Sequence, residues 1–193
     1  MRAIYLIICC LILLSCGHRP KPPAYIQKPT DTVKDAAGRK TVILAPTDST
    51  AAMNNINTGH TTPQQLIDFA QTAIGVPYKY ASADPQQGMD CSGFITYVFN
   101  HFGIAVPRTS VDFTNVKRQV LLQNALPGDL ILFTGTEIDN CTVGHMGIVV
   151  KNDEDGLQFI HSTSGKSMGV VISKLNVGYG LRYVKTVRVF PEN

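Results

Sequence analysis

The chain has 193 residues, a formal net charge of +3 at pH 7 and five cysteines. Residues 16–61 hold six Lys or Arg against three Asp, whereas residues 62–193 hold ten against eleven acidic residues. The larger part of the chain is therefore close to neutral, which argues against a nucleic-acid-binding domain, since such domains carry a basic surface. The chain is long enough to bury a core without disulfide staples.

The first fifteen residues predict export. Arg2 is followed by the apolar run AIYLIICCLILL, which is shorter than the about 20 residues of a membrane span, and residues 1–15 have the pattern of a cleaved signal peptide. The ending LLSC resembles the lipobox of bacterial lipoproteins, in which the cysteine, here Cys16, becomes the first mature residue and carries lipid. This resemblance implies a lipoprotein of the bacterial cell envelope, anchored in the inner or the outer membrane and facing the periplasm. An ordinary signal peptide cut elsewhere is the alternative.

Residues 16–61 are rich in Pro, Thr, Lys, Ala and Asn and show no sustained hydrophobic period. They are expected to form a lipidated flexible tether with a root-mean-square span of roughly 35 to 40 Å. Within this segment, KTVILA at 40–45 could form an isolated strand.

Residues 62–193 are expected to form one domain, because about 130 residues suit a single core. Its first helix is predicted to have Thr62 as N-cap, Pro63 in the first turn, Gln65 near the capping-box position and Gly75 as its stop. The apolar face of this helix is predicted to consist of Leu66, Ala70, Ala73 and Ile74.

A second helix is predicted to begin at Asp90 or Cys91. It follows residues 76–89, which contain too many turn residues to be regular, and residues 107–116 predict a further short helix capped by Ser110. The second helix has a wide apolar stripe made of Phe94, Ile95, Val98, Phe99 and Phe102.

Beyond these helices the pattern changes to short, β-branched segments separated by Gly, Asn, Asp or Ser, which indicates strands. Helices first and strands afterwards are typical of segregated layers. We therefore expect an α+β domain with N-terminal helices packed on a mostly antiparallel sheet. The predicted strands lie in 128–133, 144–150, 157–162, 169–173 and 181–190.

Cys91 is a candidate nucleophile because of its place at a helix start. With Asp90 as N-cap, its sulfur lies in the first turn, where unpaired backbone N–H groups favour a thiolate, and Gly93 is expected to leave room for a substrate backbone. A small buried hydrophobe is the alternative. A bridge to Cys141 is another alternative in an oxidising compartment.

A nucleophilic cysteine needs a base, which narrows the five histidines to two. His18 and His60 lie in the tether, and His101 sits on the cysteine helix roughly 15 Å from Cys91. His145 and His161 lie on predicted strands.

Strand alternation places His145 on one face together with Gly147 and Val149, and His161 on one face with Phe159. If these strands pair antiparallel across the turn at 151–156, both imidazoles can face the helix that bears Cys91.

We expect the two histidines to have different roles. His145 would take the thiol proton and later protonate the leaving amine, while His161 would fix the tautomer of His145. Attack on an amide carbonyl would give a thioacyl-enzyme, with the N–H of Cys91 as one oxyanion donor. Each histidine alone could be structural, and zinc ligation is disfavoured because close ligand spacing such as C-x-x-C is missing. We therefore expect neither a metal nor a cofactor.

Several motifs, in this order, match one known family: GVPYKYASADPQQGMDCSGFITYVF, VPRTS, LPGDLILF, GHMGIVV and FIHSTSGKSMGVVIS. They resemble the NlpC-type papain-like cell-wall cysteine peptidases over nearly all of 62–190. The resemblance implies a circularly rearranged papain-like fold in the α+β class. We expect the protein to be a monomer.

The resemblance also implies cleavage of peptidoglycan stem peptides, most often at the γ-D-glutamyl-diaminopimelate bond. A D,D-endopeptidase acting on cross-links, a thiol acyltransferase and a non-catalytic wall-binding lipoprotein are the alternatives.

By position, the resemblance makes Cys91 the nucleophile, His145 the base and His161 the third polar residue. Tyr80, Ala81 and Ser82 depart from the aromatic-Gly-Gly pattern frequent in the family, and Cys141 has no assignable role. The family's substrate-binding positions correspond to Tyr78, Asp90, Ser92, Arg108 and Ser110.

Overall fold

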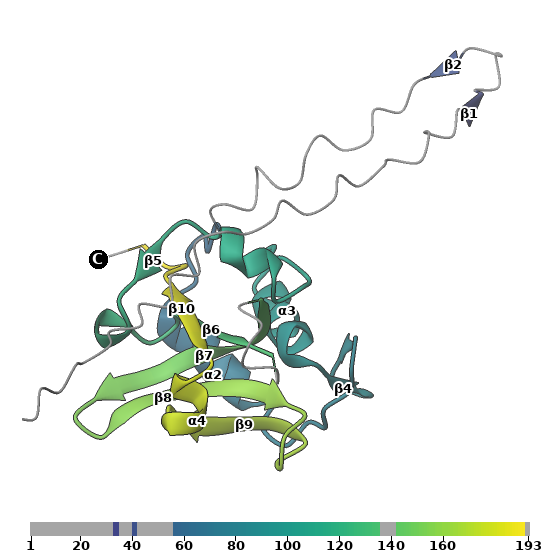
Figure 1. The fold of residues 1–193 in the computed structure, drawn as a ribbon. Coiled ribbons are helices and arrows are strands. Elements are labelled where there is room, and N and C mark those ends of the chain that lie inside the picture. The colour runs from purple at the N-terminus through teal and green to yellow at the C-terminus, as the bar shows by residue number, and fades with distance from the viewer. Residues whose placement is uncertain (1–32, 35–39, 42–55, 136–141, 192–193) are drawn as a thin grey trace, which may run out of the picture. The chain divides into compact units, whose positions relative to one another are not determined.

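The computed structural model describes residues 33–34, 40–41, 56–135 and 142–191 (Figure 1). The expected signal peptide, Cys16, most of the expected tether and Cys141 lie outside these ranges. In the N-terminal unit, strand β1 (Val33–Lys34) pairs antiparallel with β2 (Lys40–Thr41). The start of the strand expected over 40–45 is therefore paired and not isolated, and residues 42–45 lie outside the described ranges. No helix in the described ranges is long and apolar enough to span a bilayer.

The second unit begins its packed body within the expected tether. Ile56 and Thr58 are buried, and Ile56 belongs to the main hydrophobic core. The core therefore includes residues that precede the predicted domain start at Thr62.

Helix α2 (Pro63–Gln71) starts as predicted, because the Thr62 side chain accepts from the N–H of Gln65 while the Gln65 side chain accepts from the N–H of Thr62. It ends at Gln71 rather than near Gly75. Ile74 consequently leaves the helical face and is 50% exposed, which corrects its assignment to the core.

Helix α3 (Cys91–His101) has Asp90 as its N-cap, and the predicted stripe is buried except for the half-buried Phe102. The segment before it, expected to be irregular, contains a small hairpin of β3 (Ala83–Asp84) and β4 (Gly88–Met89).

The short helix expected near 107–116 is the 3-10 turn η1 (Asp112–Asn115). Its N-cap position is Val111, with no side-chain cap hydrogen bond, so Ser110 is not a cap. The chain continues through β5 (Gln119–Val120) and the 3-10 turn η2 (Leu122–Asn124).

The remaining strands and β5 form a six-stranded sheet in the order β5-β10-β6-β7-β8-β9, with every neighbouring pair antiparallel (Figure 1). The predicted α+β architecture is confirmed. The strand bounds are β6 (Leu130–Thr134), β7 (Val143–Asp153), β8 (Gly156–Thr163), β9 (Gly169–Lys174) and β10 (Tyr183–Val187), and α4 (Val177–Gly180) lies between β9 and β10.

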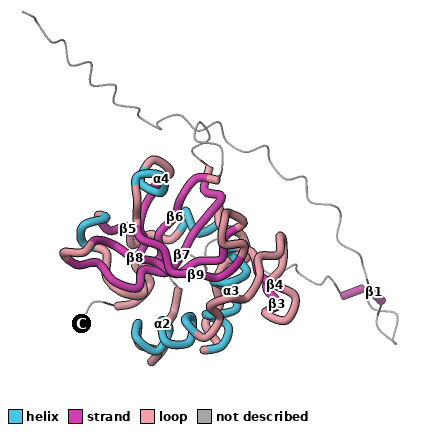
Figure 2. Tube along the Cα trace, turned by 90° about the horizontal axis from the view of Figure 1, so that it is seen from below, coloured by secondary structure: helices cyan, strands magenta, loops and turns pink. Residues whose placement is uncertain are grey.

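The sheet has apolar side chains on both faces, and each face has its own cover. Met146, Ile148 and Ile160 belong to the core that includes α2 and α3, whereas Phe133 and Phe159 pack with Tyr179 of α4. Figure 2 shows α2 and α3 on one side of the sheet and α4 on the other. One sheet therefore separates two hydrophobic cores, one on each of its faces.

Candidate active site

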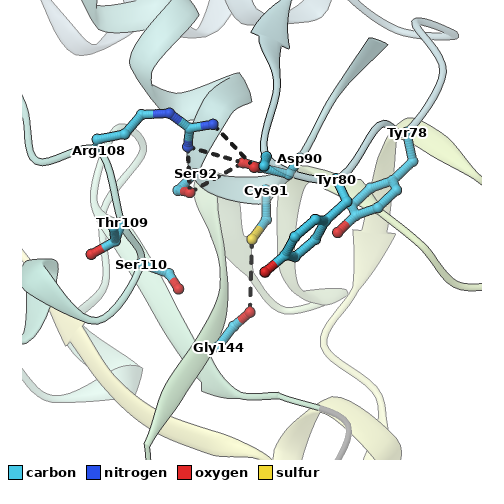
Figure 3. A pocket seen from close by; sticks show the side chains of 10 residues that line it. Tyr78, Tyr80, Asp90, Cys91, Ser92, Arg108, Thr109, Ser110 and Gly144 are labelled. Carbon is cyan, nitrogen blue, oxygen red and sulfur yellow. Dashed lines mark hydrogen bonds and ion pairs between the residues drawn. The ribbon is translucent and has the colours of Figure 1, made fainter.

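Cys91 carries a free thiol at the first position of α3. Its side chain is largely buried, and its sulfur lies 3.8 Å from the carbonyl oxygen of Gly144, which immediately precedes His145 (Figure 3). The tip of the cysteine helix therefore meets the start of β7. Because the thiol is free, the alternative of a bridge from Cys91 to Cys141 is not supported.

The thiol is held in its neutral form, which corrects the expectation of a thiolate at the helix start. Burial, followed by the nearby Asp90 carboxylate, raises the pKa of Cys91 to about 11. The backbone N–H groups of Ser92, Met146 and Cys91 itself act in the opposite direction but are outweighed. Desolvation disfavours the charged form more than the helix terminus favours it.

His145 and His161 lie side by side on the sheet. Strands β7 and β8 pair antiparallel across the turn as predicted, and His145 Nε2 lies 2.8 Å from His161 Nδ1. Gly147 lies on β7 next to β8, where an added Cβ would be 3.1 Å from that of His161 and 2.7 Å from the ring of Phe159. A residue without a side chain is therefore needed there for His161 to keep its position.

The two imidazoles do not share the sheet face that α3 covers. Both contact Phe133 or Phe159 and Tyr179, which belong to the opposite core. The expectation that they face the cysteine helix was therefore wrong in this respect. The sulfur approaches from the helix side at the end of the β6-β7 ladder, where Thr134 pairs with Val143.

Both imidazoles are neutral near pH 7. Burial, followed by His161 and Arg182, lowers the pKa of His145 to about 3, and burial followed by Arg182 lowers that of His161 to about 4. His161 Nε2 lies 3.0 Å from the Ser173 hydroxyl, which can accept a hydrogen bond from Nε2–H. In that tautomer His161 Nδ1 accepts from His145 Nε2–H, and His145 Nδ1 remains an acceptor for the thiol proton.

Two pockets flank the sulfur. The first, here called the Asp90 pocket, has a volume of about 520 Å³, and Figure 3 shows Tyr78 and Tyr80 on one side of Cys91 and Ser110 on the other. The second, here called the His145 pocket, has a volume of about 470 Å³ and shares Tyr78, Cys91 and Gly144 with the first. The Asp90 pocket is lined by Tyr78, Tyr80, Ala81, Asp90, Cys91, Ser92, Arg108, Thr109, Ser110 and Gly144. The His145 pocket adds Gly135, His145, Thr163, Ser164, Gly165, Gly178, Tyr179, Leu181 and Arg182.

In the Asp90 pocket, Arg108 is already paired. Its guanidinium donates to the two Asp90 carboxylate oxygens over 3.2 and 3.1 Å and to the Ser92 hydroxyl over 3.0 Å. Asp90 also accepts from the N–H of Gly93, so it caps the helix and joins this network at once. Arg108 therefore orients the carboxylate rather than offering a free charge to a ligand.

Gly93 does not face the pocket, contrary to expectation. An added Cβ would lie 2.0 Å from the Ser82 carbonyl oxygen, which accepts from the N–H of Asp90. The glycine is thus required by the close packing of α3 against the chain before it.

Ala81 has a backbone φ of 59°, which lies in the left-handed region that favours glycine. The family often has glycine at this position.

The structure brings together every predicted site residue in the described ranges. Sequence reasoning missed three contributors: Ser173 behind His161, Tyr179 against both imidazoles, and Arg182 in the His145 pocket. Their positions depend on the β8-β9 register and on α4, which the residue pattern alone did not specify. In the described ranges, no group of three or more His, Cys, Asp or Glu has a geometry that could hold a metal ion.

Comparison with known proteins gives a consistent result. The sequence profile described as NlpC/P60 family matches residues 75–189. The Escherichia coli (strain K12) protein named Probable endopeptidase NlpC is 30% identical over 181 residues, which is 93% of each chain. The Gamma-DL-glutamyl hydrolase of Bacillus subtilis (strain 168) is 32% identical over 126 residues, 65% of this chain and 29% of that one. The Bifunctional muramidase/DL-endopeptidase CwlT of the same organism is 30% identical over 112 residues, 51% of this chain and 34% of that one.

The matched region thus covers about a third of the two Bacillus proteins and nearly all of the Escherichia coli one. Among solved structures, an NlpC/P60 family protein from Bacillus cereus superposes with a TM-score of 0.61 at 27% identity, covering 72% of this chain and 43% of that chain. The peptidoglycan hydrolase RipB from Mycobacterium tuberculosis superposes with a TM-score of 0.53 at 25% identity, covering 67% and 65%. These likenesses confirm the predicted papain-like, NlpC-type fold.

Proposed function

Because the chain belongs to the NlpC/P60 family, we propose that it is a cysteine peptidase that cleaves the stem peptides of peptidoglycan. The observation that carries the proposal is one pocket lined by both the Cys91 thiol and the His145 imidazole, with His161 at 2.8 Å from the far nitrogen of His145. Relatives whose names include endopeptidase or peptidoglycan hydrolase support the same reaction class.

The reaction starts from a neutral thiol and a neutral imidazole. As the Cys91 sulfur attacks the amide carbonyl carbon, His145 Nδ1 takes the thiol proton, and His161 stabilises the imidazolium through the shared hydrogen bond. The carbonyl oxygen becomes an oxyanion that accepts from the N–H of Cys91 at the helix start. Tyr78 is the proposed second donor, because it lines both pockets beside the sulfur. Burial, followed by Cys91 and Asp90, raises the pKa of its hydroxyl.

The second half of the reaction uses the same groups in reverse. The His145 imidazolium protonates the amine as the carbon–nitrogen bond breaks, leaving a thioester on Cys91. His145 then takes a proton from water, which attacks the thioester carbon; the carbon–sulfur bond breaks, and the His145 imidazolium returns that proton to the sulfur, so the acid and the thiol are released. Each step conserves protons between sulfur, imidazole and water.

The two pockets hold the two halves of the substrate. His145 lines only the second pocket, so the half that leaves as an amine lies in the His145 pocket. The acyl half occupies the Asp90 pocket, where Asp90, Ser92 and Ser110 present polar groups to the amino-terminal side of the stem peptide.

The γ-D-glutamyl-diaminopimelate bond is the proposed point of cleavage. It is supported by the names of the two Bacillus relatives, a DL-endopeptidase and a Gamma-DL-glutamyl hydrolase. Cleavage of a D,D cross-link is the second candidate, favoured by likeness to the Escherichia coli protein named Murein DD-endopeptidase MepS/Murein LD-carboxypeptidase, which is 34% identical over 106 residues.

We also propose that the mature protein is a monomeric lipoprotein of the bacterial envelope, anchored through lipid on Cys16 and facing the periplasm. The support is the apolar run and LLSC ending of residues 1–16. Metabolic labelling with a fatty-acid analogue tests this, since label should be lost in Cys16→Ala and retained in Cys91→Ala.

Mass spectrometry of muropeptides digested by the purified protein tests the reaction. The D,L-endopeptidase should release fragments with a new free γ-carboxyl on glutamate and a new free amine on diaminopimelate. Separation of cross-linked dimers into monomers would instead indicate D,D cleavage, and a product lengthened by an added amine would indicate acyl transfer. Unchanged muropeptides would point to a wall-binding lipoprotein without turnover.

A further inference from the structure

The His145 pocket contains a positive charge that the proposed reaction does not use. Arg182 lines it, follows α4 in the chain, and is half-buried. Its guanidinium carbon lies 5.0 Å from the centre of the Tyr179 ring, and one of its nitrogens donates to the Gly135 carbonyl over 3.3 Å. Ring and carbonyl hold the group in place but leave most of its five N–H donors available.

Arg182 forms no ion pair with any acidic residue in the described ranges. The other arginine beside the sulfur, Arg108, is paired with both oxygens of Asp90. The two pockets therefore differ in charge: the Asp90 pocket holds a matched ion pair, whereas the described lining of the His145 pocket has a cation and no carboxylate.

The surroundings of Arg182 suit an anionic ligand. Thr163 and Ser164 also line this pocket, and the Thr163 hydroxyl, which accepts from the N–H of Gly165, keeps its own proton for donation. The charge of Arg182 also lowers the pKa of both His145 and His161, so a bound anion would relieve an unfavourable effect on the imidazolium formed during the reaction. A planar guanidinium matches a carboxylate in geometry as well as in charge.

We infer that Arg182 binds a free carboxylate on the half of the substrate that is released as an amine. The inference rests on the proposed function for the identity of that half, which in a stem peptide carries diaminopimelate. It makes the enzyme selective for stem peptides whose diaminopimelate carboxyls are free rather than amidated.

Two matched substrates test this selectivity with the full-length protein. Both are stem peptides with the same cleavable bond, and they differ only in whether the diaminopimelate carboxyls are carboxylates or carboxamides. Wild type should favour the carboxylate substrate in kcat/KM by roughly 10-fold or more, the ratio expected for a hydrogen-bonded charge. Arg182→Gln should remove this preference by slowing the carboxylate substrate alone, and Arg182→Lys should retain part of it.

Lys174→Gln is the matched control, because it removes an exposed positive charge on β9 that does not line either pocket. It should leave both kcat/KM values unchanged. Equal cleavage of the two substrates by wild type, or an equal loss on both in Arg182→Gln, would overturn the inference.

A binding measurement separates this inference from the proposed function. Calorimetry with Cys91→Ala should detect tighter binding of diaminopimelate than of its diamide, and the double variant with Arg182→Gln should bind both alike. Preferential binding without cleavage by wild type would support the carboxylate site and contradict the peptidase function. Cleavage without preferential binding would support the peptidase function and contradict the carboxylate site.

Discussion

At the scale of single residues, the state of the thiol decides how the site works. Burial raises the pKa of Cys91 to about 11, while burial lowers that of His145 to about 3, so the resting pair is neutral between these limits. In the proposed reaction the helix start acts as a donor to the oxyanion and not as the source of a resting thiolate.

Ultraviolet absorbance near 240 nm, where thiolates absorb, tests this state. The difference spectrum between wild type and Cys91→Ala should be flat at pH 7 and should rise only as the pH approaches 11, because the raised pKa keeps the proton on sulfur below that value. A full thiolate signal at neutral pH would show instead an ion pair between sulfur and imidazole.

The sequence was sufficient to single out Cys91, His145 and His161, which lie at one site in the structure, because a cysteine at a helix start and two strand histidines are local patterns. It could not predict the protonation of the sulfur, which depends on burial by residues far away in the chain. It also could not identify Ser173 or Arg182, since Ser173 reaches His161 only through the β8-β9 pairing.

At the scale of elements, the residues at which α2 and α3 start could be predicted from the sequence. Where α2 ends and how α3 packs against its neighbours could not. The caps of Thr62 and Asp90 follow from side chains within three residues of each helix start. The end of α2, the 3-10 turn at Asp112–Asn115 and the role of Gly93 depend on tertiary contacts, which sequence patterns describe poorly.

Gly93→Ala tests the packing of α3. Helix propensity alone would make alanine more stable by about 1 kcal/mol, but its Cβ would lie 2.0 Å from the Ser82 carbonyl oxygen. We expect a net loss of about 1–3 kcal/mol in the free energy of unfolding, measured by urea denaturation.

Gly180→Ala is the matched control for this substitution, because Gly180 lies at the end of α4 and an added Cβ would have no atom within 4 Å. It should be neutral or slightly stabilising. If Gly93→Ala were as stable as wild type, α3 would not be packed against Ser82 as described.

At the scale of the whole molecule, one buried ion pair connects the start of β6 to the end of β10. Arg188 donates to both oxygens of Asp129 over 3.1 Å, and Asp129 also accepts from the N–H of Leu126. This gives the PGD part of the family motif a structural role, since Asp129 follows Pro127 and Gly128 and both members of the pair are buried.

Asp129→Asn should lower the free energy of unfolding by about 3–5 kcal/mol, because it removes the buried carboxylate to which Arg188 donates through two nitrogens. Asp153→Asn removes the carboxylate of an exposed pair with Lys151 and should have no measurable effect. Thermal denaturation of both variants makes the comparison, and equal stability would contradict the role given to the buried pair.

Acid should destabilise the folded domain through its neutral histidines. His161 has an ordinary pKa of 6.5 when unfolded and about 4 when folded, so below pH 6.5 the unfolded chain binds a proton that the folded chain does not. The contribution of His161 to stability is therefore complete above pH 6.5 and falls by up to about 1.4 kcal/mol per pH unit as the pH drops towards 4.

Urea denaturation between pH 7 and 4 measures this slope. His161→Gln cannot take up that proton, so its stability should decline less steeply than that of wild type over the same range. Parallel curves for the two proteins would mean that His161 is not buried in its neutral form.

The central claim is that the Cys91 thiol at the tip of α3 is the nucleophile. The most direct measurement is the release of soluble peptides from purified sacculi by wild type, Cys91→Ala and Cys91→Ser, with thermal denaturation to show that all three are folded. We predict release by wild type and a loss of at least about 1,000-fold in both variants. Peptide release by folded Cys91→Ala at the wild-type rate would contradict the claim.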